Sequence, residues 1–293
     1  MRVLVTGCNG QVGYCLTEIL SNAENVALLA VDRADLDITN QEAVNEAVKA
    51  FKPTIIINAA AHTAVDKAED EVELSFAINR DGPKYLAEAA QEIGAAILHI
   101  STDYVFEGNK VGEYVEQDAT NPQGVYGASK LAGEIAVAEV CDKHVILRTA
   151  WVFGEHGNNF VKTMLRLAAT RNELSVVGDQ FGGPTYAGDI AKVLVEIAKH
   201  ISSGKSVEYG VYHYSGLPHV SWYEFADRIF DNAVEQGILR NKPTLLSITT
   251  DQYPTPSKRP SNSTLSSKKF TDAFAIGTSN WKAAITNLKV YTE

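Results

Sequence analysis

Short apolar runs alternate with amphipathic helical patterns along the first half of this 293-residue chain. In these runs apolar and polar residues do not alternate, as they would in a strand with one solvent-exposed face, which predicts strands buried on both faces. Parallel strands need crossover connections, and the helical patterns between the runs provide them. We therefore predict an α/β fold with a doubly wound parallel sheet. The predicted strands are RVLVTG (2–7), VALLAVD (26–32), TIIINAA (54–60), AAILHIST (95–102) and HVILRTAWVF (144–153).

Beyond residue 153 the alternation weakens, which predicts a smaller C-terminal lobe. Capping boxes are predicted at Thr39 with Glu42 and at Ser221 with Glu224. The segment 251–264 contains three prolines and is predicted to be irregular. The predicted boundaries place residues 1–150, rejoined by about 186–215, in the sheet domain and residues 151–185 and 216–293 in the lobe.

The formal net charge of −10 argues against nucleic acid or an anionic membrane as a partner. The first residues carry no apolar signal core, and no stretch approaches the roughly 18–20 apolar residues of a membrane helix. Cys8, Cys15 and Cys141 are too few and too scattered for a disulfide framework or a structural zinc site. We expect a cytoplasmic protein with free thiols.

A glycine-rich turn, TGCNGQVG, joins the first predicted strand to the first predicted helix. Gly7 permits a sharp turn, Gly10 lets the backbone approach a pyrophosphate, and Gly13 lets the helix pack closely on the strand. The helix N-terminus then offers N–H groups to phosphates. Although a glycine triplet alone is weak evidence and fits a structural turn, its place between strand and helix predicts a dinucleotide-binding domain.

Asp32 ends the second predicted strand, where an acid accepts a hydrogen bond from a ribose 2′-hydroxyl and favours NAD. The alternative is that Asp32 caps a turn. Arg33 follows directly and could instead bind a 2′-phosphate, so both NADH and NADPH remain open. Asp37 and Ile38 suit the edge of an adenine ring, or else belong to a helix start signal.

Tyr126 and Lys130 stand four residues apart in VYGASKLAGE, and so share one face of a helix. A nearby ammonium is expected to lower the pKa of the tyrosine toward neutral. A phenol tuned in this way donates a proton to an oxygen that has just received a hydride. The fourth predicted strand ends in HIST, which brings Ser101 or Thr102 to the carboxyl edge of the sheet, where ligands bind. By itself, this spacing also fits a surface pair.

Together these motifs resemble the extended short-chain dehydrogenase/reductase superfamily, whose fold is Rossmann-like. Further sequence motifs, spread over nearly the whole chain, narrow the resemblance to the family of dTDP-4-dehydrorhamnose reductases. These motifs are NAAAHTAVDKAE (58–69), STDYVFEG (101–108), YGASKLAGE (126–134), RTAWVFGEHGNNFVKTMLRLA (148–168), VVGDQFGGPT (176–185) and YPTPSKRPSNSTL (253–265).

The resemblance implies reduction of the C4 ketone of dTDP-4-dehydro-L-rhamnose by NADPH or NADH. It implies that Tyr126 donates the proton, that Lys130 holds the nicotinamide ribose and that Thr102 assists at the substrate oxygen. Thr102, Asp103 and Trp151 are then expected against the sugar nucleotide. The expected cofactor contacts are Gly7, Gly10, Gln11, Val12, Gly13, Asp32, Arg33, Asp37, Ile38, Ala60, Ala61, His62, Thr63, Tyr126 and Lys130.

Three further residues are candidates for substrate contacts on their chemistry. Trp151 offers a flat apolar wall for a deoxy sugar, or is a core aromatic residue. Arg259 follows Lys258 in a proline-bounded loop and can bind a diphosphate with two parallel hydrogen bonds, or belongs to a solvated basic loop. Asn159 opens a predicted helix whose N-terminus is a second seat for phosphate.

Some members of this family form a dimer around magnesium held by acidic side chains, so a homodimer is an open expectation here. The acidic ligand on the first helix of those members corresponds to Cys15 in this chain, and a thiol is a poor magnesium ligand. We therefore predict no metal site, with Glu18, Asp189 and Glu293 as the remaining alternative ligands.

Two other functions fit the same fold. A non-catalytic regulatory subunit is one alternative, although such proteins commonly lose the tyrosine or lysine that this chain retains. A reductase or epimerase of another nucleotide sugar is the second. A dehydratase needs an acid pair, and STDYVF supplies Asp103 without an adjacent glutamate.

Overall fold

The computed structural model describes residues 1–292 and is built on a six-stranded sheet with strand order β10-β5-β4-β3-β1-β2. All neighbouring strands are parallel, which confirms the predicted doubly wound α/β fold. The order reverses between β1 and β3, the point at which ligands bind in such sheets. The strands are β1 (Arg2–Thr6), β2 (Ala27–Val31), β3 (Ile55–Asn58), β4 (Ala96–Thr102), β5 (His144–Thr149) and β10 (Gly210–His213).

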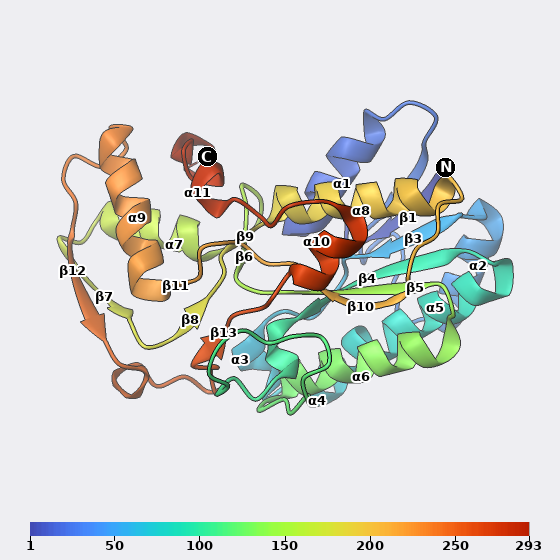
Figure 1. Cartoon of the computed structure of the whole chain (residues 1–293), viewed down its shortest axis with the longest axis horizontal. Helices are drawn as coiled ribbons and strands as arrows, with labels where there is room; N and C mark the ends of the chain where they lie inside the picture. Colours follow the sequence, from blue (N-terminus) through green and yellow to red (C-terminus); the bar gives the residue numbers. More distant parts are fainter. Residues whose placement is uncertain (293) are drawn as a thin grey trace.

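Helices cover both faces of this sheet, as Figure 1 shows. One face packs against α1 (Gln11–Ser21), α8 (Ala187–Ser202) and α10 (Lys268–Phe274). The other face packs against α2 (Gln41–Phe51), α5 (Gly82–Ile93) and α6 (Val125–Val140). The four inner strands, β1, β3, β4 and β5, are almost wholly buried, which explains their unbroken apolar sequences, whereas the edge strands β2 and β10 are partly buried.

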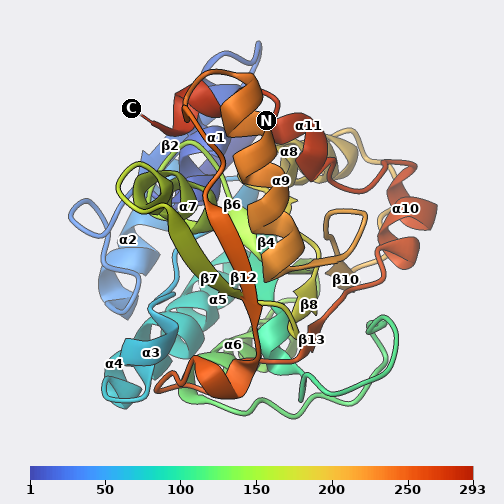
Figure 2. The same cartoon turned by 90° about the vertical axis from the view of Figure 1, so that its left-hand side faces the viewer.

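A third hydrophobic core lies at the other end of the molecule and faces the viewer in Figure 2. Phe153, Phe225, Phe230 and Trp281 are its largest fully buried side chains. Its main elements are α7 (Phe160–Ala168), β7 (Glu173–Val177), α9 (Trp222–Glu235), β12 (Thr244–Ile248) and α11 (Trp281–Ala284). Within the described residues, no helix is both long and apolar enough to cross a membrane.

Short elements connect the two parts of the chain. The short strands are β6 (Val152–Phe153), β8 (Phe181–Gly182), β9 (Thr185–Tyr186), β11 (Val220–Ser221) and β13 (Asn262–Ser263). The short helices are α3 (Val65–Ala68), α4 (Val72–Phe76), η1 (Ala77–Asp81), η2 (Asp103–Val105), η3 (Thr250–Gln252) and η4 (Leu288–Tyr291). The π-helical turn η1 joins α4 to α5 without a break.

One of the two predicted capping boxes is wrong. Helix α2 begins one residue later than predicted, because the side chain of Asn40 accepts the capping hydrogen bond from the Ala43 N–H. The Thr39 hydroxyl donates instead to Asp37. The second box is confirmed, with Ser221 and the Glu224 side chain capping α9.

The proline-containing segment 251–264 was predicted to be irregular, and this is wrong at its two ends. Gln252 completes the helical turn η3, and Asn262 and Ser263 form β13, which pairs in parallel with β8. Neither element contains a proline, so the three prolines restrict only the chain between them.

A buried ion pair joins α6 to β5. The Arg148 guanidinium donates to both carboxylate oxygens of Glu134, at 2.6–3.1 Å, and both side chains are almost fully buried. Each charge depends on the other, because an unpaired buried ion is strongly destabilising.

We predict that Glu134→Gln lowers the free energy of unfolding by about 3–5 kcal/mol, because it leaves the Arg148 charge buried without a counter-charge. Urea unfolding measures the loss. The control is Glu196→Gln, which breaks the exposed pair with Lys199 and should change stability by less than about 0.5 kcal/mol. Equal losses in the two variants would contradict this account.

Candidate active site

Helix α6 presents Tyr126, Lys130 and Glu134 in successive turns along one buried face. The Lys130 ammonium donates to the Ile100 carbonyl at 2.7 Å and lies 3.3 Å from the His99 Nε2. Both partners belong to β4, so this face of α6 is turned toward the sheet. The predicted tyrosine and lysine are therefore buried side chains, and the alternative of an exposed surface pair is wrong.

The expected effect of Lys130 on Tyr126 is also wrong. Burial raises the pKa of Tyr126 above its ordinary value, the Thr102 hydroxyl lowers it, and the Asp103 and Tyr104 charges raise it. Burial also lowers the pKa of Lys130 to about 8, while Glu134 acts in the opposite direction. Desolvation outweighs the charge partners at both groups.

Thr102 and Asp103 end strand β4 beside the phenol. The Thr102 hydroxyl donates to Asp103 Oδ1 at 3.0 Å and accepts from the Tyr104 N–H at 3.2 Å. Asp103 Oδ2 is buried without a hydrogen-bond partner among the described residues. Burial raises the pKa of the Asp103 carboxyl to about 6. The carboxyl end of β4 therefore carries the Thr102 hydroxyl and a carboxyl group whose pKa is raised.

The glycine loop packs so tightly against its neighbours that two of its glycines leave no room for a side chain. Gly7 has a φ of +70°, and a Cβ there would lie 2.6 Å from the Ala60 nitrogen. At Gly13 a Cβ would lie 2.0 Å from the Gly7 carbonyl oxygen, so only glycine lets α1 approach β1. No side chain caps α1, whose first residues are Gln11 and Val12, so its first N–H groups can meet an anion.

The Asp32 carboxylate, directly after β2, stabilises the turn that follows it. The Asp32 carboxylate accepts from the Ala34 N–H at 2.8 Å, from the Asp35 N–H at 3.2 Å, and from the Asn9 side chain of the glycine loop. The predicted turn cap is thus present, and Asn9 holds this carboxylate at the loop. Arg33 is largely exposed, with only a 3.9 Å ion pair to Asp37.

Asp37 and Ile38, the two residues expected at the adenine ring, have different surroundings. Asp37 accepts two hydrogen bonds from Thr39, which lower the pKa of its carboxyl, while Ile38 is buried beneath Gly82 in the sheet core.

Ala60, Ala61, His62 and Thr63 follow β3 beside the glycine loop. The His62 ring contacts Ser75 and pairs with Glu71 at 3.1 Å.

Asn79 is a site residue that the sequence reasoning missed. Its side chain accepts from the His62 N–H at 2.8 Å and donates to the His62 carbonyl and to the Ser129 hydroxyl, both at 3.0 Å. It therefore ties the segment after β3 to α6. Asn79 lies fully buried in the π-helical turn η1, and no local sequence pattern revealed it because its partners are distant in sequence.

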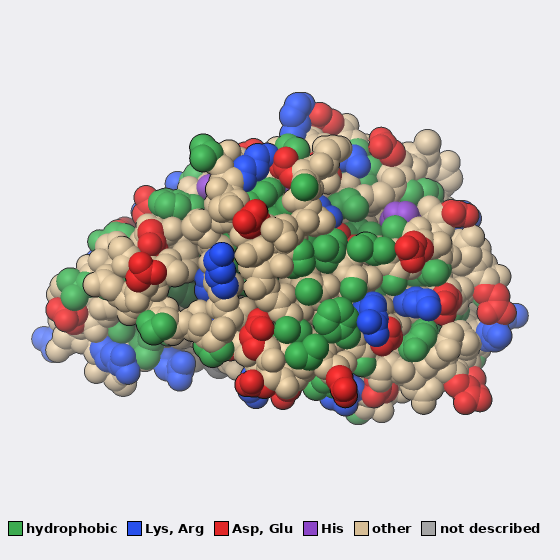
Figure 3. Space-filling model, turned by 90° about the horizontal axis from the view of Figure 1, so that it is seen from below, with side chains coloured by type: hydrophobic (Ala, Val, Ile, Leu, Met, Phe, Trp, Pro, Cys, Tyr) green, Lys and Arg blue, Asp and Glu red, His purple; other side chains and the backbone are tan. Residues whose placement is uncertain are grey.

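A cavity of about 760 Å³ opens between the sheet edge and the third hydrophobic core. Trp151 lines it, with a φ of +50°, and stacks on Trp222 with ring centroids 3.5 Å apart. Tyr104, Arg259 and Ser263 complete the wall nearest Tyr126. Figure 3 shows the molecule hollowed toward the end that holds this core, with acidic and basic side chains intermingled around it.

The two predicted phosphate ligands differ in how they are engaged. Arg259 reaches the cavity, where its guanidinium donates to Asp66 at 2.6 Å and keeps one buried nitrogen without a partner among the described residues. Asn159 instead caps α7 through the Lys162 N–H and donates to the Gly154 carbonyl and to Gln11. The side chain of Asn159 is thus committed to the protein itself.

The candidate metal ligands lie apart from this cavity. Burial raises the pKa of the Cys15 thiol to about 11, and Asp189 accepts from Ser279. Glu293 lies outside the described residues, and within residues 1–292 no group of three or more potential metal-binding side chains is found.

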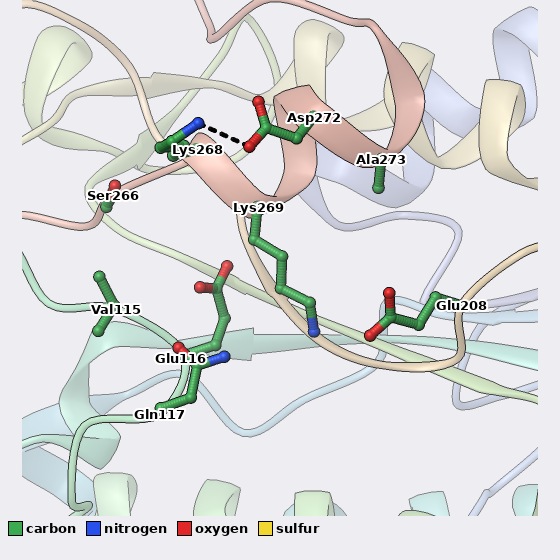
Figure 4. A pocket seen from close by; sticks show the side chains of 9 residues that line it. All are labelled: Val115, Glu116, Gln117, Glu208, Ser266, Lys268, Lys269, Asp272 and Ala273. Atoms are coloured by element: carbon green, nitrogen blue, oxygen red, sulfur yellow. Dashed lines mark hydrogen bonds and ion pairs between the residues drawn. The ribbon is translucent and has the colours of Figure 1, made fainter.

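Another hollow, of about 490 Å³, lies beside α10 (Figure 4). Its basic side chains are engaged, since Lys268 pairs with Asp272 and Lys269 donates to the Val211 carbonyl.

The profile of the RmlD substrate binding domain matches residues 1–291. A dTDP-4-dehydrorhamnose reductase of Aggregatibacter actinomycetemcomitans is 52% identical and covers 100% of this chain and 99% of its own length. A solved reductase of this type from Clostridium acetobutylicum superposes with a TM-score of 0.89 at 42% identity, covering 98% and 97% of the two chains. One from Bacillus anthracis in complex with NADP has a TM-score of 0.88 at 40% identity, covering 97% and 96%.

These likenesses extend over nearly the whole chain. They confirm the family that the sequence motifs indicated. This chain belongs to the dTDP-4-dehydrorhamnose reductase family.

Proposed function

We propose that this chain reduces the C4 ketone of dTDP-4-dehydro-L-rhamnose to dTDP-L-rhamnose with NADPH or NADH. The observation that carries the proposal is the convergence of Tyr126, Lys130 and Thr102 at the end of β4: the Thr102 hydroxyl bonds to Tyr126, and Lys130 donates to the Ile100 carbonyl. Tyr104, which lines the large cavity, lies with its ring centroid 5.4 Å from that of Tyr126. The family membership supports the same reaction. The solved Bacillus anthracis relative with NADP supports the choice of cofactor class.

The glycine loop supports dinucleotide binding because Gly7 and Gly13 let it pack against the segment after β3 and let α1 approach β1, which leaves the uncapped start of α1 at the edge of the sheet. We assign the pyrophosphate to the free N–H groups at the start of α1, and the ribose hydroxyls to Lys130. When bound, the nicotinamide supplies the hydride. Lys130 already donates one hydrogen bond to the Ile100 carbonyl, which fixes the direction of its remaining N–H groups.

Tyr126 acts as the proton donor in this proposal. Because burial raises its pKa, the phenol is protonated at neutral pH and carries the proton that the new alkoxide needs. The Thr102 hydroxyl lies beside it and helps to orient the substrate oxygen. Both groups are nearly excluded from water, which strengthens their hydrogen bonds to a developing charge.

We propose that Trp151, stacked on Trp222, forms the wall for the sugar. We assign Arg259 to the diphosphate, because its unpartnered nitrogen is available while Asp66 holds the guanidinium at the cavity wall. In this proposal residues 1–150 with 186–215 bind the dinucleotide, and residues 151–185 with 216–293 bind the substrate. Helix α10 is an addition to the first group, because it packs on the sheet.

The deciding experiment mixes purified protein, reduced nicotinamide and dTDP-4-dehydro-L-rhamnose, and follows cofactor absorbance and sugar product together. Stoichiometric oxidation of the cofactor supports the reductase. Isomerised sugar without cofactor loss would identify an epimerase, and tight cofactor binding without turnover of any ketosugar would identify a regulatory subunit.

We predict that Tyr126→Phe lowers kcat by about 10²–10⁴-fold, because the alkoxide loses its proton donor. Steady-state kinetics and the unfolding midpoint are measured together. The matched control is Tyr212→Phe, which removes another buried tyrosine hydroxyl, bonded to the Glu208 carbonyl, and should leave kcat within about threefold. Equal kcat for wild type and Tyr126→Phe would remove Tyr126 from the mechanism.

We predict a preference for NADPH that depends on Arg33, because the Asp32 carboxylate is already engaged while Arg33 is largely exposed. Arg33→Ala should lower kcat/KM for NADPH about tenfold, as expected for one lost charge-assisted hydrogen bond, and for NADH by much less. The control is Arg80→Ala, which removes an arginine paired to its neighbour Asp81. An equal loss for both cofactors in Arg33→Ala would contradict the assignment.

A further inference from the structure

A line of buried polar side chains crosses the sheet beneath the active site. Thr6, Asn58 and His99 are neighbours in register on β1, β3 and β4, and Lys130 of α6 continues the line. None of the four is more than 2% exposed. The Thr6 hydroxyl donates to Asn58 Oδ1 at 2.7 Å, Asn58 Nδ2 lies 3.0 Å from His99 Nδ1, and His99 Nε2 lies 3.3 Å from Lys130 Nζ.

A backbone donor fixes the direction of these hydrogen bonds. The Ala60 N–H, which can only donate, meets Asn58 Oδ1 at 3.1 Å. The amide of Asn58 therefore turns its NH₂ group toward His99, and His99 Nδ1 must accept. Burial lowers the pKa of His99 well below its usual value, and a charge on Lys130 would lower it further, so the ring is neutral with either form of the lysine. A neutral imidazole that accepts at Nδ1 carries its proton on Nε2.

That proton points at Lys130. An ammonium has only donors, so the ammonium form of Lys130 would face a second donor there. A neutral amine instead has one lone pair, which accepts from His99 Nε2, and it still donates to the Ile100 carbonyl. The other charged or titratable groups around Lys130 are Tyr126 and Glu134 on its own helix, Arg148 on β5, which is paired with Glu134, and Asp103 after β4.

We propose that His99 is a positioning residue: held by Asn58 with its proton on Nε2, it stabilises the amine form of Lys130 over the ammonium form. His99 thereby sets the pH at which the lysine beside Tyr126 becomes charged. Glu134 opposes this effect, and burial of Lys130 acts in the same direction as His99. The kinetic consequence rests on the proposed reductase function, whereas the tautomer of His99 does not.

The first test reads the tautomer directly. Two-bond proton–nitrogen correlation spectra of the ¹⁵N-histidine-labelled protein, with His99 assigned by its absence from His99→Gln, should show the proton on Nε2. In Asn58→Asp a carboxylate replaces the amide donor, so His99 should carry a proton on Nδ1. Thr6→Val is the matched control, because Ala60 still fixes the Asn58 amide and the tautomer should not change. A wild-type proton on Nδ1 would overturn the proposal.

The second test is the pH profile of kcat/KM. Activity should fall as pH rises through the Lys130 ionisation, because the ammonium binds the ribose. In Asn58→Asp, a neutral His99 with its proton on Nδ1 turns Nε2 toward Lys130 as an acceptor, so the ammonium form gains a hydrogen bond. When the spectra show the Nδ1 tautomer, we expect kcat/KM of Asn58→Asp to fall at a pH at least about one unit higher than in the wild type. This limb of the profile would then report a tenfold change in the protonation equilibrium of Lys130. Thr6→Val should leave the limb in place.

The outcomes separate the two proposals. A structural defect alone would lower the maximum kcat/KM of Asn58→Asp without moving the pH at which it falls. If the spectra show a changed tautomer but this pH stays the same, the coupling between His99 and Lys130 is overturned. Failure of the wild type to reduce any ketosugar would remove the proposed function while the spectra still decide the tautomer.

Discussion

The contact between α6 and its neighbours is the constraint on which the site depends. At Gly127 a Cβ would lie 2.2 Å from the Tyr104 carbonyl, and at Gly133 it would lie 2.0 Å from the Asn79 carbonyl. The helix can therefore approach η2 and η1 only because both residues are glycines. This approach buries Tyr126, Lys130 and Glu134 together, and it forces each polar group on that face to find a partner within the protein.

Burial then determines the chemistry. Desolvation favours the neutral forms of both Tyr126 and Lys130, so the tyrosine stays protonated and the lysine loses its proton more easily than in water. The site thus differs from a simple pair in which an ammonium stabilises a phenolate. The phenol that we propose as proton donor is kept neutral by burial, and the lysine is held by β4 through Ile100 and His99.

Features encoded within short segments could be predicted from the sequence. The sheet strands, the glycine loop and the i, i+4 relation of Tyr126 and Lys130 follow from local periodicity and spacing. The pKa directions could not be predicted, because they depend on how deeply distant segments bury each group. The same reason explains why Asn79 and the stacking of Trp222 on Trp151 were missed, since these contacts join parts of the chain far apart in sequence.

The ion pair between Asp66 and Arg259 joins residues 193 positions apart across the wall of the cavity. A chain emerging from the ribosome can thus complete five strands of its sheet long before it possesses this wall. Strand β10, at the edge of the sheet, follows before Arg259, and β13, which pairs with β8, comes directly after it. The wall of the cavity is therefore completed near the end of synthesis, when Arg259 ties the last part of the chain to the segment that follows β3.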